Sequence, residues 1–121
     1  MPDLLRGEPC VACRPDSPMV TMEEEQELLP QIPEWEIFEV KGERRLRRTF
    51  TLDSWDACLA FAMAVGQAAA AADHHPTMLI AWGKVTVTWW THAIRGLHRN
   101  DLIMAAQTDG LYADLGSAHG S

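Results

Sequence analysis

The segment 85–92 reads VTVTWWTH and alternates between two kinds of side chain. Its apolar side carries Val85, Val87 and Trp89, and its other side carries Thr86, Thr88, Trp90 and His92. A period of two is typical of a strand with one face on a core and the other face open. Such a strand needs hydrogen-bonded neighbours and a cover for one face only, which indicates an antiparallel sheet.

Capping and turn signals divide the rest of the chain into further elements. Thr21 and Glu24 form a capping-box pattern that opens a short acidic helix. A second, apolar helix is capped by Asp53 or Ser54 and is ended by Pro76. Strands are predicted over 35–40, 43–50, 78–81 and 85–92, and a last helix is capped by Asn100 or Asp101 and reaches Ala106 or Leu111. The sequence therefore predicts an α+β fold: a four-stranded antiparallel sheet with helices packed on one face, in the order α-β-β-α-β-β-α.

The length of 121 residues fits one domain with a single core. Residues 1–20 contain four prolines and no periodicity, so they are predicted to form a flexible leader. The folded domain is expected over residues 21–113. Residues 114–121, which end in GSAHGS, are expected to be a disordered tail.

Charge and cysteine content restrict the classes of function. A net charge of −7 disfavours nucleic acid or an anionic membrane as the main partner. No apolar run approaches the ~20 residues of a membrane span, and the first residues lack the pattern of a secretory signal. Three cysteines without such a signal favour reduced thiols and a cytoplasmic location. Cys10 and Cys13 could be half of a zinc site, although incidental leader cysteines are the favoured interpretation, and Cys58 is expected in the core.

Three of the five histidines are expected near one another. His74 and His75 follow the second helix, whose C-terminal dipole favours protonated imidazole, and Pro76 makes His75 extended. His92 ends the fourth strand, and none of the three is expected to be a core residue. Grouped imidazoles can share the proton transfers of an elimination. A structural role for each histidine stays an alternative, as does a zinc site, although neighbouring histidine side chains diverge and suit one metal poorly.

A longer spaced pattern surrounds these histidines. The stretch DHHPTMLIAWGKVTVTWWTHAIRGLHRND resembles the signature of the pterin-4a-carbinolamine dehydratases, and the likeness covers roughly residues 28–109. The matching positions are His74, His75, Pro76, Trp82, His92 and Asp101. The resemblance implies an α+β fold, a cleft for a pterin, and no metal or organic cofactor.

The resemblance also implies roles for individual residues. His74 and His92 would be general acids for the 4a-hydroxyl, His75 would bind the pterin and act as base toward N5, and Asp101 would help to organise the site. The expected pterin contacts are His75, Pro76, Trp82 and Thr91. Trp90 could also wall the flat ring, whereas Trp89 is expected in the core. The chain departs from the family at Ala70, where an acidic or polar residue is usual, and Asp73 could compensate.

The resemblance implies partners as well. Its product, a quinonoid dihydropterin, would be recycled for aromatic amino-acid hydroxylases, with phenylalanine hydroxylase as a functional partner. A homodimer or homotetramer is expected, because exposed sheet edges and an alanine-rich helix face suit pairing. The alternative is a non-enzymatic binding module on the same fold, either a transcriptional coactivator or a Rubisco assembly factor.

Overall fold

The computed structural model describes Leu5 and residues 19–119, with side chains described as far as Leu115. In chain order the elements are α1 (Met22–Leu28), the 3-10 turn η2 (Leu29–Gln31), β1 (Glu36–Val40), β2 (Glu43–Thr51), α2 (Trp55–Ala72), β3 (Thr77–Ala81), β4 (Lys84–Trp89), the 3-10 turn η3 (His92–Ile94) and α3 (Arg99–His119). The strands form one antiparallel sheet in the order β1-β2-β4-β3. The predicted fold class and element order are confirmed.

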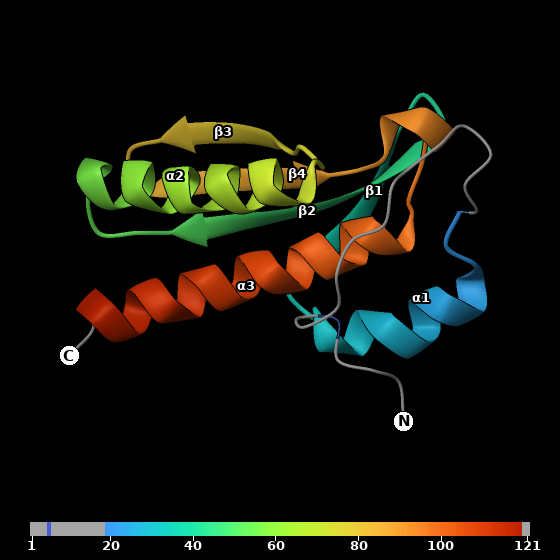
Figure 1. The fold of residues 1–121 in the computed structure, drawn as a ribbon, viewed down its shortest axis with the longest axis horizontal. Coiled ribbons are helices and arrows are strands. Elements are labelled where there is room, and N and C mark those ends of the chain that lie inside the picture. The colour runs from blue at the N-terminus through green and yellow to red at the C-terminus, as the bar shows by residue number, and fades with distance from the viewer. Residues whose placement is uncertain (1–4, 6–18, 120–121) are drawn as a thin grey trace.

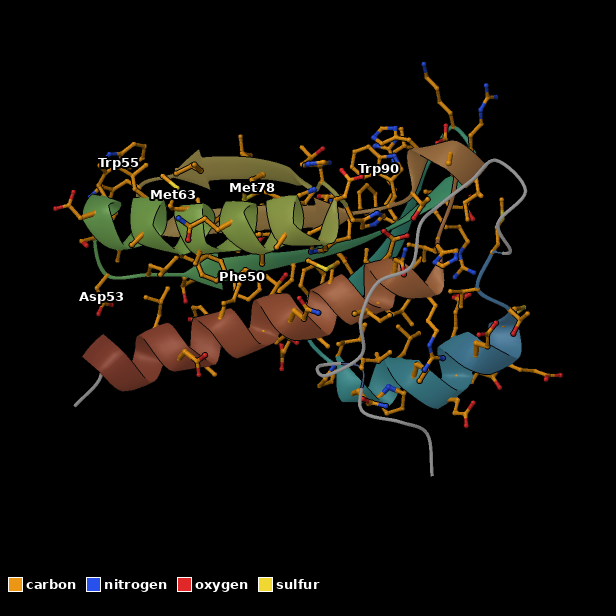
Figure 2. All side chains as sticks on the ribbon, viewed as in Figure 1. Phe50, Asp53, Trp55, Met63, Met78 and Trp90 are labelled. Carbon is orange, nitrogen blue, oxygen red and sulfur yellow. The ribbon has the colours of Figure 1, made fainter. Side chains whose placement is uncertain are left out.

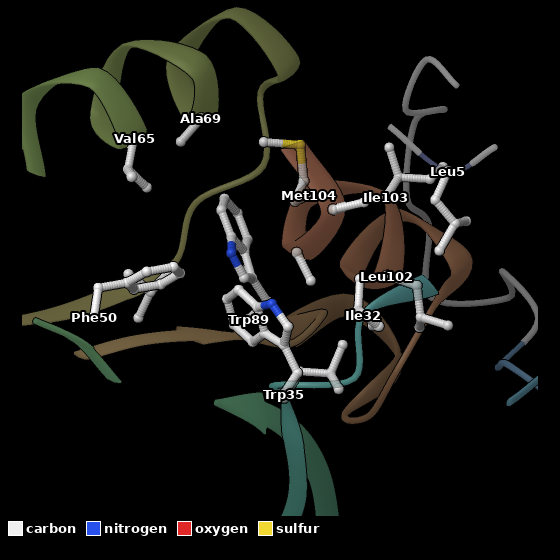
Figure 3. Close-up of a cluster of buried hydrophobic side chains, with 14 of the residues drawn as sticks. Leu5, Ile32, Trp35, Phe50, Val65, Ala69, Trp89, Leu102, Ile103 and Met104 are labelled. Carbon is white, nitrogen blue, oxygen red and sulfur yellow. The ribbon is translucent and has the colours of Figure 1, made fainter. Parts of the chain in front are cut away.

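The alternation of β4 places its apolar side chains against the helices. Figure 1 shows α2 and α3 lying on the same side of the sheet, with α1 beside the first turns of α3. Val85, Val87 and Trp89 are fully buried there, and the Trp89 indole donates to the hydroxyl of Thr108 on α3 at 3.2 Å. Figure 3 shows Trp89 at the centre of the core, between α2 and α3. The centre of this core lies directly behind the end of β4.

Two predicted helix starts are confirmed by their caps. The hydroxyl of Thr21 accepts from the backbone of Glu24, and the Glu24 carboxylate accepts from the backbone of Thr21, which completes the capping box. Ser54 caps α2 by accepting from the backbone of Ala57 at 3.0 Å. Both caps satisfy N–H groups that a first helical turn leaves without partners.

Three predicted boundaries were wrong. The fourth strand ends at Trp89 and not at His92, because Thr91 pairs with Gly96 and turns the chain, which puts His92 in η3. The second helix ends at Ala72, where Asp73 adopts a left-handed conformation (φ 52°), so it stops before His74 and not at Pro76. The last helix starts at Arg99, before either predicted cap, and it continues to His119.

The leader prediction falls largely outside the described residues. Residues 1–4 and 6–18, which include Cys10 and Cys13, are not described. Leu5 is described, and it is fully buried in the core with its backbone N–H donating to Gln31 Oε1 at 3.0 Å. The leader interpretation did not anticipate this contact. Cys58 is a free, buried thiol on α2, as expected.

The α2 helix has two apolar sides, and only one of them is covered. Its core side carries Cys58, Phe61, Ala62, Val65 and Ala69. Its other side exposes Trp55, Leu59 and Met63, and Figure 2 shows Trp55 and Met63 projecting away from α3. By length and composition alone, α2 is also apolar enough to cross a membrane, which the sequence analysis did not anticipate. A core helix of a soluble protein passes the same test, so this is weak support for a membrane span.

Candidate active site

Asp101 is a buried carboxylate in the first turn of α3. Its side chain is completely shielded from solvent. Oδ1 accepts from His74 Nε2 at 2.7 Å, whereas Oδ2 accepts from the hydroxyl of Thr91 at 2.7 Å and from the backbone N–H of His98 at 2.9 Å. Three donors around a buried carboxylate satisfy both of its oxygens and fix its orientation.

His74 is held by Asp101 on one edge and by Trp89 on one ring face. The imidazole and indole planes are 3° apart, with ring centroids separated by 5.7 Å. Since an ionised carboxylate accepts but does not donate, His74 Nε2 carries a proton, and Nδ1 is the nitrogen available for proton transfer. His74 is only 8% exposed, so the expectation that no site histidine is a core residue was wrong for His74. The buried pair explains this placement, because charge and hydrogen bonds offset the burial of the ring.

His75 and His92 lie at the open side of the same site. A cavity of about 280 Å³ is lined by Asp73, His74, His75, Pro76, Thr77, Trp90, Thr91, His92 and Ala93. His75 and His92 are both exposed, so they can meet a ligand without any displacement of the core. The structure therefore brings together three predicted histidines, Pro76 and Thr91, with Asp101 directly behind them.

Trp90 forms an aromatic wall of the cavity. The centroids of the Trp90 and His92 rings are 4.6 Å apart, and the guanidinium carbon of Arg45 lies over the Trp90 ring, 4.1 Å from its centroid. Trp90 directly follows the last residue of β4 and is 8% exposed. A flat heterocycle could contact such a ring at small entropic cost.

Trp82 is not placed in this cavity. It lies in the turn between β3 and β4 and is 71% exposed. The five residues of β3 separate it from Pro76, and at about 3.3 Å per residue this amounts to roughly 17 Å. Among the described residues, Trp90 and not Trp82 lines the cavity together with the three histidines. Ala70 is exposed on α2, and Asp73, the residue expected to compensate for it, does line the cavity.

His98 is a site residue that sequence reasoning missed. Its Nδ1 accepts from the backbone N–H of Asn100 at 3.0 Å, so it caps α3. Burial of the ring lowers the pKa of His98, a shift opposed by Asp101 and Glu24 and reinforced by His74. The available signal was the order His-Arg-Asn-Asp, which has the spacing of a capping box with histidine in the position usually held by serine or threonine.

Two other observations bear on what the site could hold. A larger hollow of about 600 Å³ lies between the start of α2 and the far part of α3, where its polar lining includes Asp53, Ser54 and Tyr112 but no histidine. Within Leu5 and residues 19–115, no group of three or more histidine, cysteine, aspartate or glutamate side chains is arranged to hold a metal ion. The smaller cavity is the candidate because it gathers three histidines.

The fold and this cavity define a small α+β domain in which a buried aspartate–histidine pair opens onto two exposed histidines. A sequence model described as pterin 4 alpha carbinolamine dehydratase matches residues 18–111, and the chain belongs to that family. It is 53% identical over 108 residues to a Gloeobacter violaceus protein provisionally named pterin-4-alpha-carbinolamine dehydratase 1, covering 89% of this chain and 93% of that protein.

Two further proteins show the same likeness. A Nitrosococcus oceani protein, provisionally named pterin-4-alpha-carbinolamine dehydratase, is 51% identical over 102 residues, which cover 84% of this chain and 90% of that protein. A crystal structure described as transcriptional coactivator/pterin dehydratase from Brucella melitensis superposes with a TM-score of 0.70 at 26% identity, covering 78% of this chain and 99% of that one. These findings confirm the family that the histidine spacing indicated.

Proposed function

We propose that this protein is a cytoplasmic dehydratase that converts a 4a-hydroxytetrahydropterin to a quinonoid dihydropterin and water. The observation that carries the proposal is the Asp101–His74 pair at 2.7 Å, which lies behind the exposed His75 and His92 in one cavity. In this role it would recycle the pterin of an aromatic amino-acid hydroxylase such as phenylalanine hydroxylase.

The reaction requires two proton transfers, and the cavity offers groups for both. The C4a–O bond breaks as the hydroxyl gains a proton and leaves as water, and N5 loses its proton as the C4a–N5 double bond forms. His74 or His92 donates to the hydroxyl according to which face of the pterin carries it, and His75 accepts the proton from N5. Asp101 accepts a hydrogen bond from His74 Nε2 and so orients the His74 ring. Positioned acid/base groups contribute about 10²–10⁴-fold each, so imidazoles suffice for this reaction.

The pterin would lie against Trp90 and Pro76 with its 4a carbon toward the histidines. Both side chains line the cavity, and both are apolar surfaces suited to a flat ring. Thr91 also lines the cavity, but its hydroxyl donates to Asp101, so we assign it to holding the carboxylate. The proposed contacts are therefore His75, Pro76 and Trp90.

The test of the function is a coupled phenylalanine hydroxylase assay in which loss of the 4a-hydroxypterin is followed with and without this protein. We expect a faster loss that is unchanged by exhaustive treatment with EDTA, because the proposed steps use only imidazole and carboxylate groups. A rate equal to the buffer blank would refute the enzyme. A rate that falls with EDTA and returns with zinc would refute the metal-free mechanism.

A second candidate is a binding role, favoured by the description of the Brucella melitensis relative as a transcriptional coactivator as well as a pterin dehydratase. A binding module would use exposed surface and would not need the histidine cavity. If the wild-type protein is inactive in the coupled assay but still forms a stoichiometric complex with a transcription factor encoded near it, the binding role is the function.

We also propose that the protein is a homodimer or homotetramer that pairs through the exposed side of α2. Trp55, Leu59 and Met63 recur at intervals of four residues there and are 44%, 43% and 63% exposed. Figure 1 shows β3 running beside α2 toward the start of that helix, which brings the exposed Trp82 to the same end. Contiguous apolar side chains of this kind mark an interface on soluble proteins.

Substitution on this helix should dissociate the assembly. Light scattering should give the wild type a mass that is a multiple of 13.5 kDa, and Met63→Glu should reduce it to that of one chain, because a carboxylate would be desolvated at the contact. Met22→Glu is the control, since Met22 is a comparably exposed methionine on α1. A wild-type mass of 13.5 kDa, or an equal effect of both substitutions, would contradict the proposed interface.

A further inference from the structure

We propose that His98 is a positioning residue for the dehydration: as a neutral imidazole it caps α3 and so holds Asp101 in place behind His74. The proposal rests on the proposed function of the cavity. It assigns a role to a histidine that contacts no substrate and lines no part of the cavity.

Three hydrogen bonds tie His98 to the first turn of α3. Its backbone N–H donates to Asp101 Oδ2 at 2.9 Å, and its carbonyl accepts from the backbone N–H of Asp101 at 2.9 Å. Its ring Nδ1 accepts from the backbone N–H of Asn100 at 3.0 Å. This is a reciprocal capping arrangement in which the cap side chain fixes the start of the helix and Asp101 reaches back to the cap. The carboxylate that orients His74 is thus anchored at the cap.

A histidine cap differs from the usual caps in one chemical respect. Nδ1 can accept a hydrogen bond only while it carries no proton, which requires the neutral tautomer protonated at Nε2. A serine, threonine or asparagine cap accepts at every physiological pH. Protonation of His98 would remove the acceptor from the N–H of Asn100 and would place a positive charge near His74. The cap therefore depends on pH where a serine cap would not.

Three titratable side chains influence His98, and each comes from a different part of the chain. Asp101 belongs to α3, His74 follows α2, and Glu24 belongs to α1. Burial is the largest influence and lowers the pKa of His98 from 6.5, His74 lowers it further, and the two carboxylates raise it. Since the folded pKa is the lower one, the unfolded chain takes up this proton first as the pH falls. The contribution of His98 to the free energy of unfolding is therefore full above about pH 6.5, and it is lost as the pH falls from that value toward the lower pKa of the folded protein.

The test compares two variants with the wild-type protein. His98→Asn keeps an accepting side-chain oxygen but cannot titrate, and His98→Ala removes the cap. We expect His98→Ala to lower kcat about tenfold with little change in KM, because the unanchored carboxylate of Asp101 would orient His74 less well. His98→Asn should stay within about twofold of wild type at neutral pH and should keep its activity to a lower pH. Equal kcat for His98→Ala and wild type, or equal losses in both variants, would overturn the proposal.

Histidine NMR on the full chain supplies a readout independent of activity. At neutral pH the wild-type His98 ring should be the Nε2–H tautomer. The His74 ring resonances should shift in His98→Ala and stay in place in His98→Asn. An Nδ1–H tautomer at His98, or unmoved His74 resonances in His98→Ala, would overturn the positioning role. If the wild-type protein has no dehydratase activity, the proposed function fails, and these resonances still decide the role of His98. If His98→Ala does not fold, the wild-type tautomer and the pH profile of His98→Asn decide it.

Discussion

Asp101→Asn should lower the free energy of unfolding by about 3 kcal/mol, the scale of breaking a buried charge pair from one side. The native carboxylate receives hydrogen bonds from His74, Thr91 and the backbone of His98, and it is fully buried. An asparagine of the same shape has one accepting oxygen, and its NH₂ group would face a donor. At least one buried donor would then lose its acceptor.

The same substitution should slow the dehydration of the 4a stereoisomer that His74 protonates about 100-fold or more, because His74 loses the group that orients it. Urea unfolding and the coupled assay measure the two effects separately. Asp109→Asn is the matched control on the same helix: Asp109 accepts from Arg48 and from the Trp35 indole, away from the cavity. The control should lose stability but retain turnover. Wild-type turnover in Asp101→Asn would contradict the role given to the buried pair.

His75→Ala should have an equally large effect on the rate, and it should act on activity alone. His75 is exposed at the mouth of the cavity, so far-UV circular dichroism and the melting temperature should match those of the wild type. As the proposed base and pterin contact, it should lower the rate about 10²–10⁴-fold for both 4a stereoisomers and should raise KM. Unfolding of this variant would support a structural role for His75 instead.

His74 and His92 provide the comparison for that experiment. Replacing either by alanine should leave partial activity on one 4a stereoisomer, since the two are proposed to protonate opposite faces. His92 is exposed, so His92→Ala should be as stable as the wild type. His74→Ala should be less stable by about 2–4 kcal/mol, because it leaves Asp101 without a partner and a gap beside Trp89. Equal and small losses for all three variants would mean that the cluster is not the catalytic apparatus.

The fold could be predicted from sequence where the signals are local. The alternation of residues 85–89 determines which face of β4 is buried, and the hydroxyls of Thr21 and Ser54 mark helix starts because each accepts from a backbone N–H three residues on. The end of β4 could not be predicted in this way. It depends on the pairing of Thr91 with Gly96, which stops an alternation that the sequence itself continues to His92.

The residues of the candidate site could be predicted from the sequence better than their arrangement could. The family resemblance predicted the histidines and Asp101 as site residues. The burial of His74, in contrast, depends on its stacking with Trp89 and on its bond to Asp101, 27 residues further along the chain. His98 was missed because histidine is not among the common cap residues. Trp82 is one of the positions of the family pattern, yet it lies at the opposite end of β3 from His75, because the extended strand Thr77–Ala81 separates the two residues.

The most direct test of the account is the rate of 4a-hydroxypterin loss, measured side by side for the wild-type protein, His75→Ala and the buffer blank between about pH 6 and 8.5. The account predicts that the wild-type protein accelerates the loss and that His75→Ala, although folded, removes most of the acceleration for both stereoisomers. A wild-type rate equal to the blank throughout this range, or a His75→Ala rate equal to that of the wild type, would contradict it.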